Sequence, residues 1–91
     1  MSEEYQFHTR QKSDLFSYPY RMERGELLFC LQGGVQLYIN QQKYALAAGS
    51  VILVFPEQIT FYKDATDDLE LAVFAFSAQF RHEIFYSLPS D

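Results

Sequence analysis

Residues 26–56 read ELLFCLQGGVQLYINQQKYALAAGSVILVFP and decide the fold. Two apolar, alternating runs meet at Gly33 and Gly34, a polar turn follows over residues 40–43, and residues 48–50 form a corner before a third apolar run. Alternation with a period of two is the pattern of β-strands, and glycine pairs and polar clusters mark turns. The stretch therefore predicts a β-meander that closes on itself.

The glycine pair predicts a tight hairpin, because glycine adopts positive φ angles freely. In that register Cys30 lies opposite Leu37, and two faces result. One face carries Glu26, Leu28, Cys30, Val35, Leu37 and Ile39; the other carries Leu27, Phe29, Leu31, Gln36, Tyr38 and Asn40. A sheet covered on one side only should be polar on the other. The apolar residues of the second face therefore predict a cover: a terminal helix, the N-terminal segment or a second subunit.

The flanking segments complete the predicted barrel. Residues 1–14 lack a helical or strand period of useful length and are predicted to form an N-terminal arm. Disorder, an edge strand and a fold over a cavity are open alternatives for this arm. The chain is expected to enter the sheet over residues 15–22, where Pro19 suits an edge or a bulge. Further strands are predicted at residues 44–46, 51–55, 59–63 and 69–76.

The end of the chain changes character. Ser77 is well placed to cap a helix, which is predicted within residues 77–88. Strands first and a helix last predict one all-β domain: a barrel over residues 15–76 with a short C-terminal helix.

Composition narrows the function. The 91 residues allow one domain, and a net charge of -5 argues against a surface that grips a phosphate backbone, since Arg10 and Lys12 alone form no basic patch. The single cysteine, Cys30, cannot form an intrachain disulfide, and we expect a buried, inert thiol. The two histidines, His8 and His82, are expected at the surface. Without a signal-peptide pattern or a membrane-spanning run, a cytoplasmic location is expected.

The central stretch resembles the cupin family and, within it, the N-terminal effector-binding and dimerisation domain of AraC-family transcription regulators. The resemblance covers residues 21–76. The first cupin motif, G-x5-H-x-H-x3,4-E-x6-G, is met at its end by Glu26 and Gly33, and the second, G-x5-P-x-G-x2-H-x3-N, is met at its start by Gly49. The ending AVFAFSAQF is also typical of these sensors.

The departures from the motifs concern the metal ligands. The two histidine positions of the first motif fall on Tyr20 and Met22 with the shorter spacing, or on Pro19 and Arg21 with the longer, and Thr60 stands at the histidine of the second. Three of the four ligands of a metal-binding cupin are therefore absent, and a lone carboxylate is no transition-metal site. We expect neither a metal nor another cofactor.

The resemblance implies a metal-free, jelly-roll (double-stranded β-helix) cupin barrel that senses a small effector such as a sugar, forms a homodimer and is not an enzyme. It also implies that DNA is contacted by two helix-turn-helix units that such regulators carry after the sensor, so that this chain, which stops at Asp91, does not touch nucleic acid itself. Two alternatives are open. One is a small cupin enzyme (sugar isomerase, epimerase or lyase) that uses Glu26 and a tyrosine as acid and base; the other is a protein-association module without a ligand.

No residue is assigned a catalytic role. The candidate ligand contacts inside the barrel are Tyr20, Met22, Glu26, Leu28, Cys30, Leu37, Ile39, Thr60 and Tyr62. The candidates for a dimer or helix-cover face are Leu27, Phe29, Leu31, Tyr38, Phe80 and Ile84. The competing structural interpretation is that side chains fill so small a barrel, with Glu26 at a wet rim or paired with Arg21 or Arg24.

Overall fold

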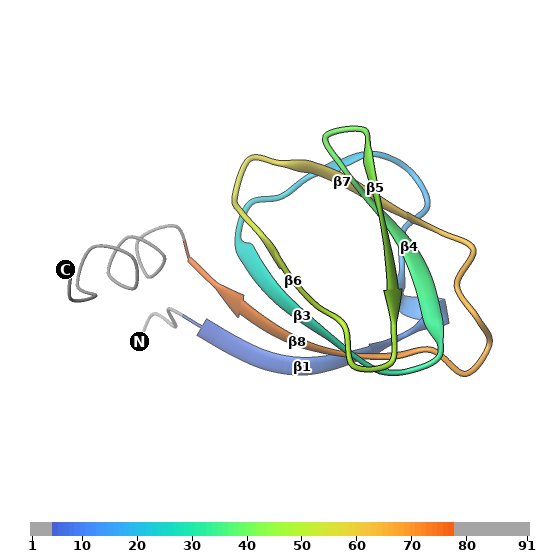
Figure 1. Ribbon diagram of the computed structural model, residues 1–91. Helices are drawn as coiled ribbons and strands as arrows, with labels where there is room; N and C mark the ends of the chain where they lie inside the picture. The colour runs from blue at the N-terminus through green and yellow to red at the C-terminus, as the bar shows by residue number, and fades with distance from the viewer. Residues whose placement is uncertain (1–4, 78–91) are drawn as a thin grey trace, which may run out of the picture.

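The structure is a computed structural model that describes residues 5–77, and these form two antiparallel sheets that face each other (Figure 1). The first sheet has the order β1-β8-β3-β6 and the second the order β2-β7-β4-β5. The first sheet comprises β1 (Tyr5–Gln11), β8 (Glu70–Phe76), β3 (Gly25–Gln32) and β6 (Val51–Val54). The second comprises β2 (Tyr20–Arg21), β7 (Ile59–Lys63), β4 (Gly34–Ile39) and β5 (Gln42–Ala47). The predicted all-β jelly-roll barrel is confirmed. The predicted C-terminal helix beyond Ser77, with Phe80 and Ile84, lies outside the described residues.

The predicted hairpin at Gly33 and Gly34 is wrong. β3 pairs with β6 and β8, β4 pairs with β5 and β7, and the chain crosses from one sheet to the other between them. Gly33 has a φ of +75°, whereas Gly34 already begins β4. A Cβ on Gly33 would collide with Thr66 and Asp68 of the loop before β8. The glycine is therefore explained by a tight crossover packed against a distant loop.

The two-residue hairpin turn occurs instead between β4 and β5. Asn40 and Gln41 have φ angles of 49° and 74°, the pair of left-handed conformations that a tight hairpin requires. The Asn40 side chain stabilises the turn from outside, because its Oδ1 accepts a hydrogen bond from the Ile59 backbone N–H at 2.9 Å. The polar turn expected over residues 40–43 is thus present, and it ties the second sheet together.

The predicted inward face is confirmed despite the wrong pairing. Side chains alternate along a strand whatever its partner, and the inward positions change from even to odd numbers across Gly33 and Gly34, as predicted. All six inward positions are at most 7% exposed: Glu26, Leu28, Cys30, Val35, Leu37 and Ile39. Leu71 and Val73 of β8 complete the core with 0% exposure. The middle of the barrel is filled by aliphatic side chains.

The N-terminal segment is an edge strand, which was one of its three alternatives. β1 pairs with β8 from Tyr5↔Phe76 to Gln11↔Glu70, and the 3-10 helix η1 (Lys12–Asp14) follows it. Residues 5–11 therefore belong to the barrel, for which the sequence predicts a start at residue 15. Of the expected strand over residues 15–22, the ladder includes only the two residues of β2.

The outer face of the first sheet is apolar. Leu27, Phe29 and Leu31 are 39%, 41% and 46% exposed, and no described residue covers them. In register with them lie Leu53 and Val51 of β6 and Phe74 of β8. Phe7 of β1, opposite Phe74, is 69% exposed. We call this face, formed by Phe7, Leu27, Phe29, Leu31, Val51, Leu53 and Phe74, the outer apolar face.

Tyr38 does not share this face, which corrects its grouping with Leu27 and Phe29. It lies on β4 in the second sheet, where its ring stacks on Phe61 with centroids 4.5 Å apart. The grouping assumed that β3 and β4 pair, and the crossover between the sheets separates them.

Candidate functional site

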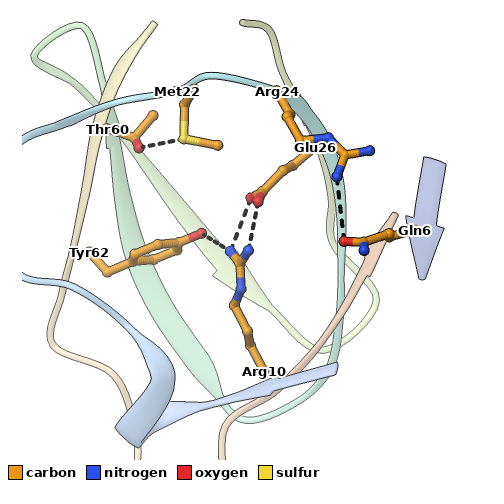
Figure 2. A network of polar contacts seen from close by, with 7 residues as sticks. All are labelled: Gln6, Arg10, Met22, Arg24, Glu26, Thr60 and Tyr62. Carbon is orange, nitrogen blue, oxygen red and sulfur yellow. Dashed lines mark hydrogen bonds and ion pairs between the residues drawn. The ribbon is translucent and has the colours of Figure 1, made fainter. Parts of the chain in front are cut away.

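A buried ion pair lies inside one end of the barrel (Figure 2). Arg10 is on β1 and Glu26 is at the start of β3, and both side chains point between the sheets. Arg10 Nη1 donates to Glu26 Oε1 at 3.0 Å, and Nη2 donates to Oε2 at 2.6 Å. The side chains are 18% and 10% exposed. This two-pronged geometry is the strong form of a guanidinium–carboxylate contact, held in an otherwise apolar barrel.

Tyr62 of β7 extends the pair across to the second sheet. Arg10 Nη1 also lies 3.4 Å from the Tyr62 hydroxyl, and Tyr62 is 4% exposed. Burial, with the charge of Glu26 as a second cause, raises the pKa of Tyr62 to about 12. For Arg10, burial alone would lower the pKa, but the hydrogen bonds and charge of Glu26 outweigh it and raise the pKa above its usual value. The guanidinium and the phenol therefore stay protonated at neutral pH.

Met22 and Thr60 lie beside this network. The Thr60 hydroxyl lies 3.3 Å from Met22 Sδ, and both residues are buried. The Met22 backbone is held by the turn before β7, since its N–H donates to the Gln58 carbonyl at 2.8 Å and its carbonyl accepts from the Glu57 N–H at 2.7 Å. The Met22 thioether lines the same small pocket as Glu26, the Tyr62 phenol shares the Arg10 guanidinium with it, and the Thr60 hydroxyl lies next to Met22.

A small pocket of about 120 Å³ opens at this end of the barrel. It is lined by Tyr20, Met22, Glu23, Arg24 and Glu26. Small-molecule sites usually measure about 300–1,000 Å³. The pocket beside Glu26 therefore admits only a small group unless neighbouring side chains move.

The predicted interior residues divide into three groups. Met22, Glu26, Thr60 and Tyr62 meet at the polar end described above. Leu28, Cys30, Leu37 and Ile39 are buried and fill the barrel beyond it. Tyr20 lies at the rim: it lines the small pocket but is 41% exposed, and its ring lies 5.1 Å from that of Phe16 on the edge strand β2.

The expected partners of Glu26 are wrong. Arg21 pairs with Glu57 at 3.2 Å on the surface, and Arg24 donates to Gln6 at 3.4 Å. The true partner is Arg10, which the sequence interpretation left in a polar arm. The only signal in QFHTR is weak: if residues 5–11 are taken as a strand, Arg10 shares its face with Gln6. Gln6 then bonds to Arg24, just before β3, and Arg10 bonds to Glu26 within it (Figure 2).

Cys30 is the buried thiol that was expected. It is 0% exposed, and its Sγ lies 3.5 Å from the carbonyl oxygens of both Gln32 and Gly33, which share its single proton. Burial raises the pKa of Cys30, which lowers the fraction of nucleophilic thiolate. Across residues 5–77, no three His, Cys, Asp or Glu side chains lie close enough together to hold a metal ion. The same residues include no helix that is long and apolar enough to span a membrane.

Comparison with known proteins agrees with this geometry. Residues 5–91 match the family described as the AraC-like ligand binding domain. The chain belongs to this family. Family membership supports a ligand-sensing role in an AraC-like regulator. Within the described residues, the buried polar side chains of Arg10, Glu26 and Tyr62 meet at one end of the barrel. No curated protein matches the chain by sequence.

Several solved structures share the fold. A cupin from Bacteroides fragilis has a TM-score of 0.63 and 16% identity, over 96% of this chain and 70% of that chain. An RmlC-like cupin from Shewanella frigidimarina has a TM-score of 0.65 and 14% identity, over 86% and 69%. KdgF from a Halomonas species has a TM-score of 0.60 and 13% identity, over 66% of this chain and 56% of that one. The chain thus spans little more than half of KdgF, and likeness at this identity shows the fold alone.

Proposed function

We propose that this domain binds a small polyhydroxylated effector, with a sugar as the leading candidate, at the Glu26 end of the barrel, and that binding is transmitted to DNA-binding units elsewhere in an AraC-like regulator. The observation that carries the proposal is the buried Arg10–Glu26 pair. Replacing a buried ion pair by apolar side chains is often neutral or stabilising. A contribution to folding stability is therefore a poor explanation for the Arg10–Glu26 pair. A carboxylate and a guanidinium are, however, well suited to bind neighbouring hydroxyl groups.

The geometry supports a mechanism of exchange. The pocket beside Glu26 is smaller than an ordinary ligand site, so an effector has to displace Arg10 from the carboxylate. Arg10 stands on β1, an edge strand that pairs with β8 alone. Loss of the Arg10 contacts would weaken the attachment of β1 to the barrel. The resulting shift of β1 is the conformational change that would be transmitted to the DNA-binding units.

The outer apolar face supports a second part of the proposal, a homodimer. The face runs across all four strands of the first sheet, and its exposed side chains include Phe29 and Leu31. Contiguous apolar patches of this kind mark association surfaces on soluble domains. In sedimentation velocity, wild type is expected to dimerise and Phe29→Lys to be monomeric, with Ile59→Lys on the second sheet as the exposed control. A wild type that is monomeric at high concentration contradicts the dimer.

Ligand binding is tested by thermal shift and calorimetry against sugars and small polar metabolites, with wild type, Glu26→Gln and the control Glu57→Gln. Glu57 also pairs with an arginine, but at the exposed surface. An effector at about 100 times its Kd stabilises a domain of this size by roughly 10–20 °C. Wild type and Glu57→Gln should show the shift, and Glu26→Gln should lose it. No shift with any compound, or equal loss in both variants, contradicts the proposal.

The same variants address the enzyme alternative. Tyr62 lies next to Glu26, as an acid–base pair requires, but its raised pKa works against a phenolate base at neutral pH. A sensor that loses Glu26 loses affinity alone. Conversion of a sugar by wild type, abolished in Glu26→Gln, would establish the enzyme instead.

A further inference from the structure

A larger pocket, of about 440 Å³, lies where η1 and the loop after it meet the end of β7. Leu15 and Phe16 of the loop line it, as do Phe61 and Tyr62 of β7. The Tyr62 N–H donates to the Phe16 carbonyl at 3.1 Å, which holds the two segments together. The volume lies within the usual range of about 300–1,000 Å³ for small-molecule sites. No residue that lines this pocket lines the small one beside Glu26.

The aromatic rings of these residues are held in place before any ligand arrives. Phe61 stacks on Tyr38 with ring centroids 4.5 Å apart, and the Tyr62 ring is buried. Phe16 meets Tyr62 edge to face, with centroids 5.3 Å apart. Flat rings that are already ordered cost little entropy to use, which favours a flat apolar ligand.

Charged side chains of both signs stand at the mouth of the pocket. Lys12, Lys63 and Asp64 line it. Lys12 is already engaged, since its Nζ lies 2.8 Å from Asp67 Oδ1. Lys63 has no ion-pair partner among residues 5–77. It is therefore the cation left to receive an anionic group from a ligand.

We propose that this pocket is a second binding site, distinct from the Glu26 end, and that it takes a flat, largely apolar carboxylic acid. The apolar body of the ligand lies against Leu15 and Phe16, and its carboxylate meets Lys63. Ala65, which also lines the pocket, leaves the room that the ligand occupies.

The second site has a physical connection to the first. Tyr62 lines the pocket, while its hydroxyl contacts Arg10 within the barrel. An acid bound in this pocket therefore contacts Tyr62, whose hydroxyl hydrogen-bonds with the Arg10 of the Arg10–Glu26 pair. Binding itself does not require Glu26, so the second site stands or falls independently of the effector proposed above.

The test uses 1-naphthoate as the probe and 1-naphthamide as its neutral counterpart, with the full chain, calorimetry and backbone amide NMR. Naphthoate should bind and shift the amides of residues 61–65, and the amide should bind more weakly. Lys63→Gln should weaken naphthoate roughly five-fold, the size expected for a solvent-exposed charge contact. Ala65→Leu, which fills the pocket, should weaken it by at least ten-fold. Lys43→Gln, an exposed lysine on β5, is the matched control and should leave affinity unchanged.

Two further variants separate this site from the Glu26 end. Glu26→Gln and Tyr62→Phe both keep the aromatic rings and should bind naphthoate within two-fold of wild type. The proposal is overturned if naphthoate and naphthamide bind alike, if Lys43→Gln weakens binding as much as Lys63→Gln, or if the shifted amides lie outside the pocket. It is equally overturned if Ala65→Leu, folded by its amide spectrum, binds as wild type does.

Discussion

Breaking the Arg10–Glu26 pair one side at a time is the most informative perturbation. In Arg10→Met the Glu26 carboxylate keeps its position, 10% exposed, and loses both of its guanidinium hydrogen bonds. Removing one partner of a fully buried pair costs about 3–5 kcal/mol. Because the Arg10 side chain is 18% exposed, water relieves part of this cost, and we expect about 2–4 kcal/mol. Glu26→Met, which strands the guanidinium, should cost a similar amount.

The double variant Arg10→Met/Glu26→Met distinguishes a pair from two separate contacts. With both charges gone, the barrel end becomes apolar, and the free energy of unfolding should return to within about 1 kcal/mol of wild type. The assay is urea unfolding followed by tyrosine fluorescence, because the chain has seven tyrosines and no tryptophan. For a domain this small, a slope of about 1–1.5 kcal/mol per molar urea turns a loss of 3 kcal/mol into a midpoint shift of roughly 2–3 M.

Lys12→Met is the control for losing a cation close to β1. Its ion pair with Asp67 is exposed to solvent, so its loss should leave the urea midpoint almost unchanged. The reasoning is refuted if Arg10→Met and Glu26→Met each behave like this control. It is also refuted if the cost of the double variant equals the sum of the two single costs, since the two residues would then not interact.

Three further outcomes are expected. Gly33→Ala should destabilise by roughly 2–4 kcal/mol in the same urea assay, because a positive φ and a collision with Thr66 combine, whereas Gly49→Ala, with open space around it, should cost about 1 kcal/mol from its φ alone. The pKa of Tyr62 is raised to about 12 in the folded state against 10 in the unfolded chain. Its contribution of about 2–3 kcal/mol to the free energy of unfolding is therefore complete below pH 10 and is lost as the pH rises to 12. The free energy of unfolding should fall more steeply with rising pH in wild type than in Tyr62→Phe. Cys30 should resist a thiol reagent at pH 8 in the folded protein and react in urea, and fast labelling of native protein would contradict its burial.

The sequence by itself determined local features: which side chains of a strand face inward and where some strands lie. Alternation is a property of a single strand, and it predicted correctly which residues of 26–39 face inward and that Leu27 and its neighbours form a second apolar face. Strand position was also readable: the run Ile59–Lys63 was predicted with the boundaries that the structure has. The cupin motif and the alternation of its strand together predicted that Glu26 points into the barrel, where it is 7% exposed.

Only the tertiary structure decided which strands pair and what each polar side chain meets. Gly33 marks a crossover and not a hairpin, because the requirement for a glycine comes from a loop more than thirty residues away. Arg10 was unreadable as a partner of Glu26 for the same reason: an edge strand of mixed polarity has no strong period, and its place is set by pairing with β8 at the far end of the chain. The larger pocket likewise forms between η1 with its following loop and β7. Neither segment alone has a sequence pattern that predicts a cavity, because both are needed to form it.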